Sequence, residues 1–196
     1  MNRIGIFGSS FNPIHIGHMI IADQAIERFN LDKILFVPTK TPYHKKSDIL
    51  DFDFRTQMAY IEAQKHGKIE VSNVEQNIEG NSYTFDVIRL LEKEYRDTKF
   101  YFIMGSDSLV NFDTWYKYDK LLDMIEFIVF KRPGDEDLSD LIEEYRQVGM
   151  SIHYYDDLQL EISSTFIRES IKAGKSVRYL LSDEIIRYIE SNRFYE

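Results

Sequence analysis

Short apolar runs rich in β-favouring residues alternate with helical patterns along the whole chain. Six runs are predicted to form strands, at residues 3–7, 33–37, 69–72, 99–104, 126–130 and 151–155. Six further stretches are predicted to form helices, at residues 19–29, 54–65, 84–95, 138–148, 164–172 and 183–191. Alternation of this kind indicates βαβ units on a parallel sheet with helices on both faces. The sequence therefore predicts an α/β, Rossmann-like, doubly wound fold in a single domain over residues 1–196.

The predicted sheet also indicates where a ligand would bind. In open parallel sheets the ligand lies at the carboxyl ends of the strands. The stretch 8–18 follows the first predicted strand, and Gly105-Ser106-Asp107 follows the fourth. We therefore expect both to border one crevice.

The stretch 8–18 reads Gly-Ser-Ser-Phe-Asn-Pro-Ile-His-Ile-Gly-His, between a strand and a helix. A strand, a turn of small residues and a helix start form a place where backbone N–H groups can face a phosphate. Gly8 is expected to let the backbone turn where a Cβ would clash. Ser9 and Ser10 add hydroxyl donors.

His15 and His18 lie three residues apart, so both can point the same way from a helical turn. Gly17, between them, is expected to leave room for a ligand. The two imidazoles could stabilise charge that develops on a phosphate oxygen. They could also bind a metal, which ranks lower because the chain has no Cys and no third ligand lies nearby in the sequence. Two purely structural histidines are the remaining interpretation.

A second anion site is predicted near the C-terminus, in Ile162-Ser163-Ser164-Thr165-Phe166-Ile167-Arg168. Ser163 or Ser164 can cap the predicted helix. Arg168 lies one turn into that helix, and its guanidinium can reach back and add a forked contact to a phosphate. A helix N-terminus with an arginine would have to face the first site if both hold one triphosphate.

Composition excludes several classes of protein. No apolar run approaches the roughly 18 residues of a membrane span, and the N-terminus enters a predicted strand without a signal-peptide pattern. The absence of Cys excludes disulfides and thiolate chemistry. We therefore expect a cytoplasmic protein with no membrane partner. The net charge of −9 argues against a nucleic-acid partner, but a few local cations can still hold a small anion.

The two motifs resemble signatures of the nucleotidyltransferase superfamily, H-x-G-H and I-S-S-T-x-I-R. The segments between them are similar to the bacterial nicotinate-mononucleotide adenylyltransferases, in Pro42-Tyr43-His44-Lys45, Ser82-Tyr83-Thr84-Phe85-Asp86, Gly105-Ser106-Asp107-Ser108-Leu109 and Trp115-Tyr116. The resemblance covers essentially the whole chain, residues 1–196, as one nucleotidyltransferase domain. Two positions depart from the usual pattern, since Ser9 replaces a common glycine and Asn12 a more common aspartate.

The resemblance implies transfer of the adenylyl group of ATP to nicotinate mononucleotide, giving deamido-NAD and pyrophosphate. It implies that the catalytic residues are His15, His18 and Arg168. It assigns ATP binding to Gly8, Ser9, Ser10, Phe11, Gly17, Gly105, Asp107, Ile162, Ser163, Ser164 and Thr165, and mononucleotide binding to His44, Lys45, Ser82, Tyr83, Thr84 and Trp115. Mg²⁺ would be carried mostly by the ATP phosphates, and no protein metal ligand is assigned.

For three groups of residues, the sequence allows more than one role. Ser82 or Thr84 can cap the predicted helix, which is compatible with N–H groups that receive a carboxylate. Trp115 can pack in the core or, as the resemblance implies, stack on the pyridine ring. Arg55 can bind phosphate or pair with Asp51 or Asp53.

Two other functions stay open from the sequence. One is adenylyl transfer to another phosphorylated acceptor, such as nicotinamide mononucleotide or phosphopantetheine. The other is a non-catalytic module that senses ATP, against which the intact His15, His18 and Arg168 argue. Assembly into a homo-oligomer is also left open.

Overall fold

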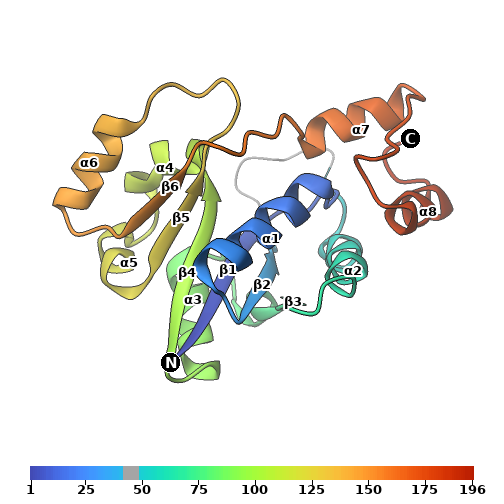
Figure 1. The fold of residues 1–196 in the computed structure, drawn as a ribbon. Coiled ribbons are helices and arrows are strands. Elements are labelled where there is room, and N and C mark those ends of the chain that lie inside the picture. Colours follow the sequence, from blue (N-terminus) through green and yellow to red (C-terminus); the bar gives the residue numbers. More distant parts are fainter. Residues whose placement is uncertain (42–48) are drawn as a thin grey trace.

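The computed structural model describes residues 1–41 and 49–196, and its centre is one six-stranded sheet (Figure 1). All its strand pairs are parallel. The strands are β1 (Asn2–Ser9), β2 (Lys33–Pro38), β3 (Ile69–Val71), β4 (Thr98–Gly105), β5 (Glu126–Phe130) and β6 (Ile152–Tyr155). Their order across the sheet is β3-β2-β1-β4-β5-β6. The predicted α/β doubly wound fold is confirmed.

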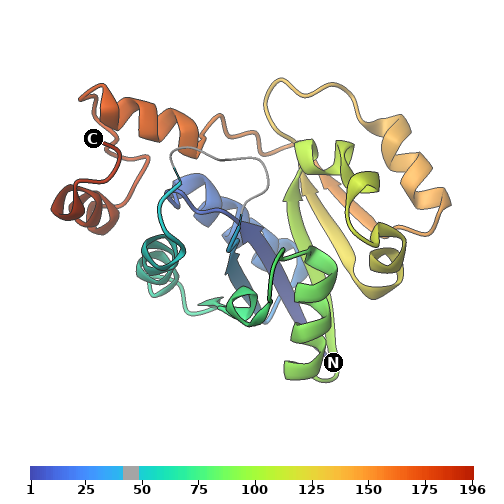
Figure 2. The same cartoon turned by 180° about the vertical axis from the view of Figure 1, so that it is seen from behind.

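Helices cover both faces of the sheet, each over its own apolar core. One core includes residues of α1 (Ile16–Phe29), α2 (Phe52–Ala63), α7 (Ser164–Lys172) and α8 (Asp183–Asn192). The opposite core includes residues of α3 (Thr84–Glu94), α4 (Ser106–Val110), α5 (Tyr118–Met124) and α6 (Ser139–Gln147). Figure 2 shows this second set in front of the sheet. None of the helices in the described part of the chain has the length and apolar character needed to cross a membrane.

The structure contains all the predicted strands and helices, and it adds four short elements. The largest boundary error is at α1, which begins at Ile16 rather than at residue 19. The added elements are η1 (Val74–Asn77), α4, η2 (Phe112–Thr114) and α5. Three of them lie between residues 106 and 124, where no single element is long enough to show a clear period.

The sheet reverses its strand order between β1 and β4. Successive connections run from β1 through β2 to β3 on one side, and from β4 through β5 to β6 on the other. Ligands of open α/β sheets bind at such a switch point, beyond the carboxyl ends of the strands. The segments that follow Ser9 and Gly105 therefore face each other across the crevice expected from the sequence.

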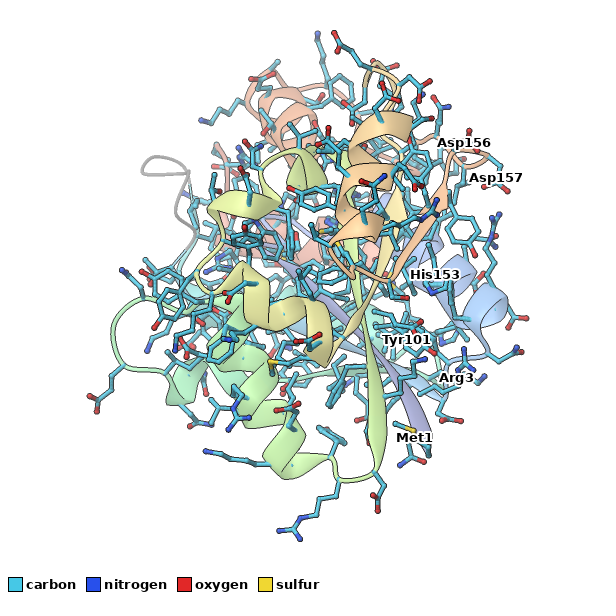
Figure 3. The ribbon with its side chains drawn as sticks, turned by 90° about the vertical axis from the view of Figure 1, so that its left-hand side faces the viewer. Met1, Arg3, Tyr101, His153, Asp156 and Asp157 are labelled. Atoms are coloured by element: carbon cyan, nitrogen blue, oxygen red, sulfur yellow. The ribbon has the colours of Figure 1, made fainter. Side chains whose placement is uncertain are left out.

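Polar side chains tie α1 to the β6 edge of the sheet. Arg28 lies 2.8 Å from the Asp157 carboxylate and 4.6 Å above the Tyr155 ring. His153 and Asp157 lie on the same side of the molecule (Figure 3), where His153 Nε2 is 2.8 Å from Glu126 Oε2. Each surface ion pair contributes little stability on its own; the Arg28 contacts join α1 to the sheet edge, and the His153–Glu126 contact joins β6 to β5.

Candidate active site

A cavity of about 460 Å³ opens at the carboxyl ends of β1 and β4. Its lining includes most residues predicted to bind ATP, namely Gly8, Ser9, Ser10, Gly17, Gly105, Ile162, Ser163, Ser164 and Thr165. It also includes His15 and His18, together with Ser82, Thr84 and Trp115 from the predicted mononucleotide site. Segments that are more than 140 residues apart in the chain therefore meet around one space.

The turn after β1 differs from the one expected. Gly8 still belongs to the strand, and a Cβ there would lie an ordinary 3.7 Å from the Phe102 ring, so the expectation that Gly8 relieves a clash is wrong. The residue with left-handed backbone is Phe11, at φ +47°. Its ring is fully buried and packs 5.1 Å from the His18 ring, centroid to centroid. The Phe11 ring therefore packs against the His18 ring, and Phe11 is not among the residues that line the cavity.

The two histidines are held against each other at the start of α1. Their ring centroids are 3.8 Å apart. The backbone N–H of His15 donates to Nδ1 of His18 at 3.1 Å, so Nδ1 is an acceptor and the proton of the neutral ring is on Nε2. His18 therefore brings a hydrogen-bond donor to the cavity while its other nitrogen fixes the ring.

His15 is neutral at physiological pH. Burial, followed by the positive charge of Arg132, lowers its pKa from 6.5 to about 4. Both histidines are more than nine-tenths buried, at 7% and 9% exposure. The site therefore contains uncharged imidazole at His15 beside a permanently charged guanidinium.

Gly17 is required by the position of His15. A Cβ on residue 17 would lie 3.1 Å from Nδ1 and 3.2 Å from Cε1 of the His15 ring. The glycine of the H-x-G-H pattern thus lets the imidazole lie against the first turn of α1. The space beside Gly17 is thus occupied by the His15 ring, and the expectation that it leaves room for a ligand stays a prediction.

The start of α7 lies beside the start of α1. Ser163 caps α7, since its Oγ accepts from the N–H of Phe166 at 3.1 Å. Ser164 Oγ donates to the carbonyl of Pro13 at 2.9 Å. The positive ends of two helix dipoles therefore meet at one side of the cavity, an arrangement that favours anions.

Arg168 is buried and bonded to the protein itself. Its guanidinium donates to the Asn12 carbonyl at 2.9 Å and to Thr165 Oγ1 at 3.3 Å. Asn12 is also fixed through its side chain, whose Oδ1 accepts from the Tyr195 hydroxyl at 2.8 Å. The described lining of the cavity does not include Arg168, so its direct contact with a phosphate stays a prediction.

Gly105, the last residue of β4, lines the cavity, but the Asp107 side chain in the following segment is directed elsewhere. Asp107 Oδ1 lies 2.8 Å from Arg132 Nε, and the described lining includes Arg132 but not Asp107. A Cβ on Gly105 would come within 2.5 Å of Asp107 Oδ1 and 2.8 Å of Arg132 Nε, so a larger residue there would have to displace this ion pair.

Sequence reasoning missed two cations of the cavity, Lys131 and Arg132. Both residues directly follow Phe130, the last residue of β5. The rule that segments after parallel strands border the ligand site is therefore the signal that would have found them.

The predicted mononucleotide end has a different cap from the one expected. Tyr83 is the N-cap residue of α3, so the interpretation of Ser82 or Thr84 as the cap is wrong. The Tyr83 ring packs against Tyr116 with ring centroids 4.5 Å apart, and it lies outside the described lining. Trp115 packs on Phe102 with ring centroids 5.6 Å apart, and it also lines the cavity.

Arg55 has neither of the roles considered from the sequence. It is 1% exposed, and it donates to the carbonyls of Leu50, Ser10, Thr39 and Lys40 at 2.9, 2.7, 2.8 and 3.4 Å. Arg55 therefore ties together the backbone segments that follow β1 and β2. The predicted phosphate contacts of His44 and Lys45 lie outside the described residues.

No cluster of metal ligands accompanies these residues in the described part of the chain, where three or more His, Asp or Glu side chains do not gather around one point. The carboxylate of Asp107 is engaged by Arg132. This donor set fits a metal that enters with its own phosphate ligands better than one held by the protein.

Comparison with known proteins identifies the family. Residues 6–170 match the cytidylyltransferase-like family. The chain is 36% identical over 197 residues to the nicotinate-nucleotide adenylyltransferase of Bacillus subtilis (strain 168), and the match covers all of both proteins. The chain belongs to the nicotinate-nucleotide adenylyltransferase family. A probable member from Exiguobacterium sibiricum is 38% identical over 193 residues, which cover 98% of each protein.

The fold of this adenylyltransferase family member also matches solved structures. The Plasmodium falciparum nicotinic acid mononucleotide adenylyltransferase complexed with NaAD superposes with a TM-score of 0.81 at 20% identity, over 100% of this chain and 98% of that one. The resemblance drawn from the two sequence motifs is confirmed, and the chain is an enzyme of this family.

Proposed function

We propose that this enzyme transfers the adenylyl group of ATP to nicotinate mononucleotide, which forms deamido-NAD and pyrophosphate in NAD biosynthesis. The observation that supports it most is the meeting of the α1 and α7 N-termini, joined by the Ser164–Pro13 hydrogen bond beside His15 and His18. Two converging helix starts suit the triphosphate of ATP.

The main requirement of this reaction is that the acceptor phosphate and the α-phosphorus of ATP are aligned. A phosphate oxygen of the mononucleotide forms a bond to the α-phosphorus of ATP, and the bond between that phosphorus and the bridging oxygen breaks. Pyrophosphate leaves with the electron pair. Because the nucleophile is already anionic at neutral pH, the protein needs to position it and stabilise the departing charge.

The residues of the cavity divide these tasks. His18 donates from Nε2 to a phosphate oxygen, and the neutral His15 lies 3.8 Å away, centroid to centroid. Lys131 and Arg132 add permanent positive charge from the end of β5. Mg²⁺ carried by the ATP phosphates neutralises further charge when it is bound. Arg168 acts through Asn12 and Thr165, which it holds in place.

The acceptor occupies the end of the cavity formed by Ser82, Thr84 and Trp115. The first turn of α3 presents N–H groups and a positive dipole end there, and a carboxylate accepts such bonds fully. A carboxamide would turn an NH₂ donor toward the same donors. An unmade buried hydrogen bond costs about 1–3 kcal/mol, and the loss of a charge-assisted contact adds to it. Nicotinate mononucleotide is therefore the preferred acceptor.

The experiment measures kcat/KM for the acid and amide mononucleotides at fixed ATP, with pyrophosphate release as the signal. We expect the acid to be preferred by about tenfold to a thousandfold. Equal values or a preference for the amide would overturn the acceptor assignment. ATP binding without turnover of either mononucleotide or phosphopantetheine would instead favour a nucleotide sensor.

A further inference from the structure

Glu75 is a buried carboxylate in the wall of the cavity. It lies in η1, just after β3, and its side chain is 5% exposed. The backbone N–H of Lys40 donates to Glu75 Oε2 at 2.7 Å. Burial raises the pKa of Glu75, while this hydrogen bond and the nearby cations of Arg55 and Lys40 oppose the shift. Neither the sequence motifs nor the chemistry above gives this carboxylate a role.

Glu75 is held by the Lys40 N–H, and the two nearby cations direct their hydrogen bonds to backbone carbonyls rather than to its carboxylate. Arg55 directs its hydrogen bonds to four backbone carbonyls. The Lys40 ammonium donates to the carbonyl of Ile78 at 3.0 Å. The Thr39–Lys40 segment is thus held by Arg55 through its carbonyls and by Glu75 through its amide. The Glu75 carboxyl group therefore lines the cavity, together with Thr39, without an ion-pair partner among the described residues.

Glu75 belongs to the acceptor end of the cavity. The Ser82 hydroxyl lies beside its carboxylate and lowers its pKa, although the geometry falls short of a hydrogen bond. Ser82 precedes α3, whose first residue, Thr84, also lines the cavity. A negative carboxylate and the positive end of a helix dipole therefore flank the same small region.

Nicotinate mononucleotide carries a matching pair of charges. Its pyridine nitrogen is bonded to ribose, so the ring is a pyridinium cation, and its carboxylate is an anion. We propose that Glu75 is a specificity-determining residue that selects acceptors with a positively charged ring. This inference rests on the proposed function. Ordinary purine and pyrimidine mononucleotides have neutral rings, and they would add no positive charge beside the buried Glu75 carboxylate, whereas a pyridinium ring would.

The role of Glu75 differs from recognition of the acid group. Nicotinamide mononucleotide has the same charged ring without the carboxylate, so Glu75 favours both pyridinium mononucleotides. Its reduced, dihydropyridine form has nearly the same shape but an uncharged ring. These two compounds therefore isolate the ring charge.

The test uses the full-length enzyme and its Glu75→Gln variant. Glutamine keeps an oxygen to accept from the Lys40 N–H and nearly the same volume, but it removes the charge. Competitive inhibition constants of oxidised and reduced nicotinamide mononucleotide are measured against nicotinate mononucleotide. We expect the wild type to bind the oxidised form more tightly, and we expect the variant to lose about tenfold of this preference with KM for ATP unchanged. Glu79→Gln, which removes an exposed charge four residues away, is the matched control.

Three outcomes would overturn the inference. The wild type could bind both forms equally, the preference could survive in Glu75→Gln, or the variant could weaken both forms equally, as a purely structural role predicts. Glu75→Asp keeps the charge and should keep the preference, which provides a second test if the glutamine variant does not fold. Failure of the wild type to form deamido-NAD would overturn the proposed function as well, whereas the three outcomes above leave it standing.

Discussion

His18 combines two contacts that substitution can separate. Nδ1 accepts from the His15 N–H at 3.1 Å, and Nε2 carries the proton that we assign to a phosphate oxygen. In an asparagine the side-chain oxygen lies about where Nδ1 lies, and in a glutamine the amide nitrogen lies about where Nε2 lies. His18→Asn should therefore keep the contact with His15 and lose the donor, whereas His18→Gln should do the reverse.

The two contacts have different expected magnitudes. Removing one preorganised donor to a developing oxyanion costs about 10²–10³-fold in kcat. Removing a side-chain contact to a helix N-terminus costs about 0.5–2 kcal/mol of stability. The lost packing of the His18 ring on Phe7 and Phe11 affects both variants alike. We thus expect the asparagine variant to lose turnover by about 10²–10³-fold, and the glutamine variant to keep more turnover but unfold at lower temperature.

The assay is steady-state pyrophosphate release at saturating ATP and nicotinate mononucleotide, with thermal unfolding measured on the same samples. KM for ATP should change much less than kcat, because the donor acts mainly in the transition state. An asparagine variant with near wild-type kcat would refute the donor role of Nε2. Equal turnover in the two variants would show that the ring, rather than one of its nitrogens, matters.

Two further predictions concern His15 and Arg168. Because His15 has a folded pKa of about 4, below its ordinary 6.5, the unfolded chain binds more protons between these values. Its contribution of about 3 kcal/mol is therefore complete above pH 6.5 and is lost as the pH falls toward 4, and denaturant unfolding of His15→Gln should lack this slope. Arg168→Lys retains a charge but cannot contact Asn12 and Thr165 together, so kcat should fall while the fold survives; unchanged kcat would contradict the positioning role.

The fold was predictable because the spacing of apolar residues within each short stretch of sequence already distinguishes strands from helices. The central strands are runs of apolar residues buried on both faces, as in β5, where residues 127–130 are all buried. The site was predictable where a motif is contiguous in sequence. Ser163, Ser164 and Thr165 are neighbours in the chain, and all three line the cavity.

Prediction failed where a side chain's partner lies far away in the sequence. Arg55 was weighed against nearby Asp51 and Asp53, but one of its bonds goes to the carbonyl of Ser10, 45 residues away. Gly8 and Phe11 were assigned from the motif alone, and a motif does not say which residue of a turn adopts the left-handed backbone. The contacts that shape the surroundings of the cavity therefore include ones that no local pattern marks.

The division of charge between His15 and Arg132 shows why such distant residues matter for the chemistry. Arg132 is one of the two causes that hold the pKa of His15 at about 4, and burial is the larger. A neutral imidazole donates a hydrogen bond without a protonation step in the physiological range, while the guanidinium supplies charge at any pH. If His15 itself had to carry the positive charge, binding of the triphosphate would change as the pH crossed the ordinary histidine range. Because Arg132 follows β5 and His15 follows β1, this separation of donor and charge exists only once the sheet has formed.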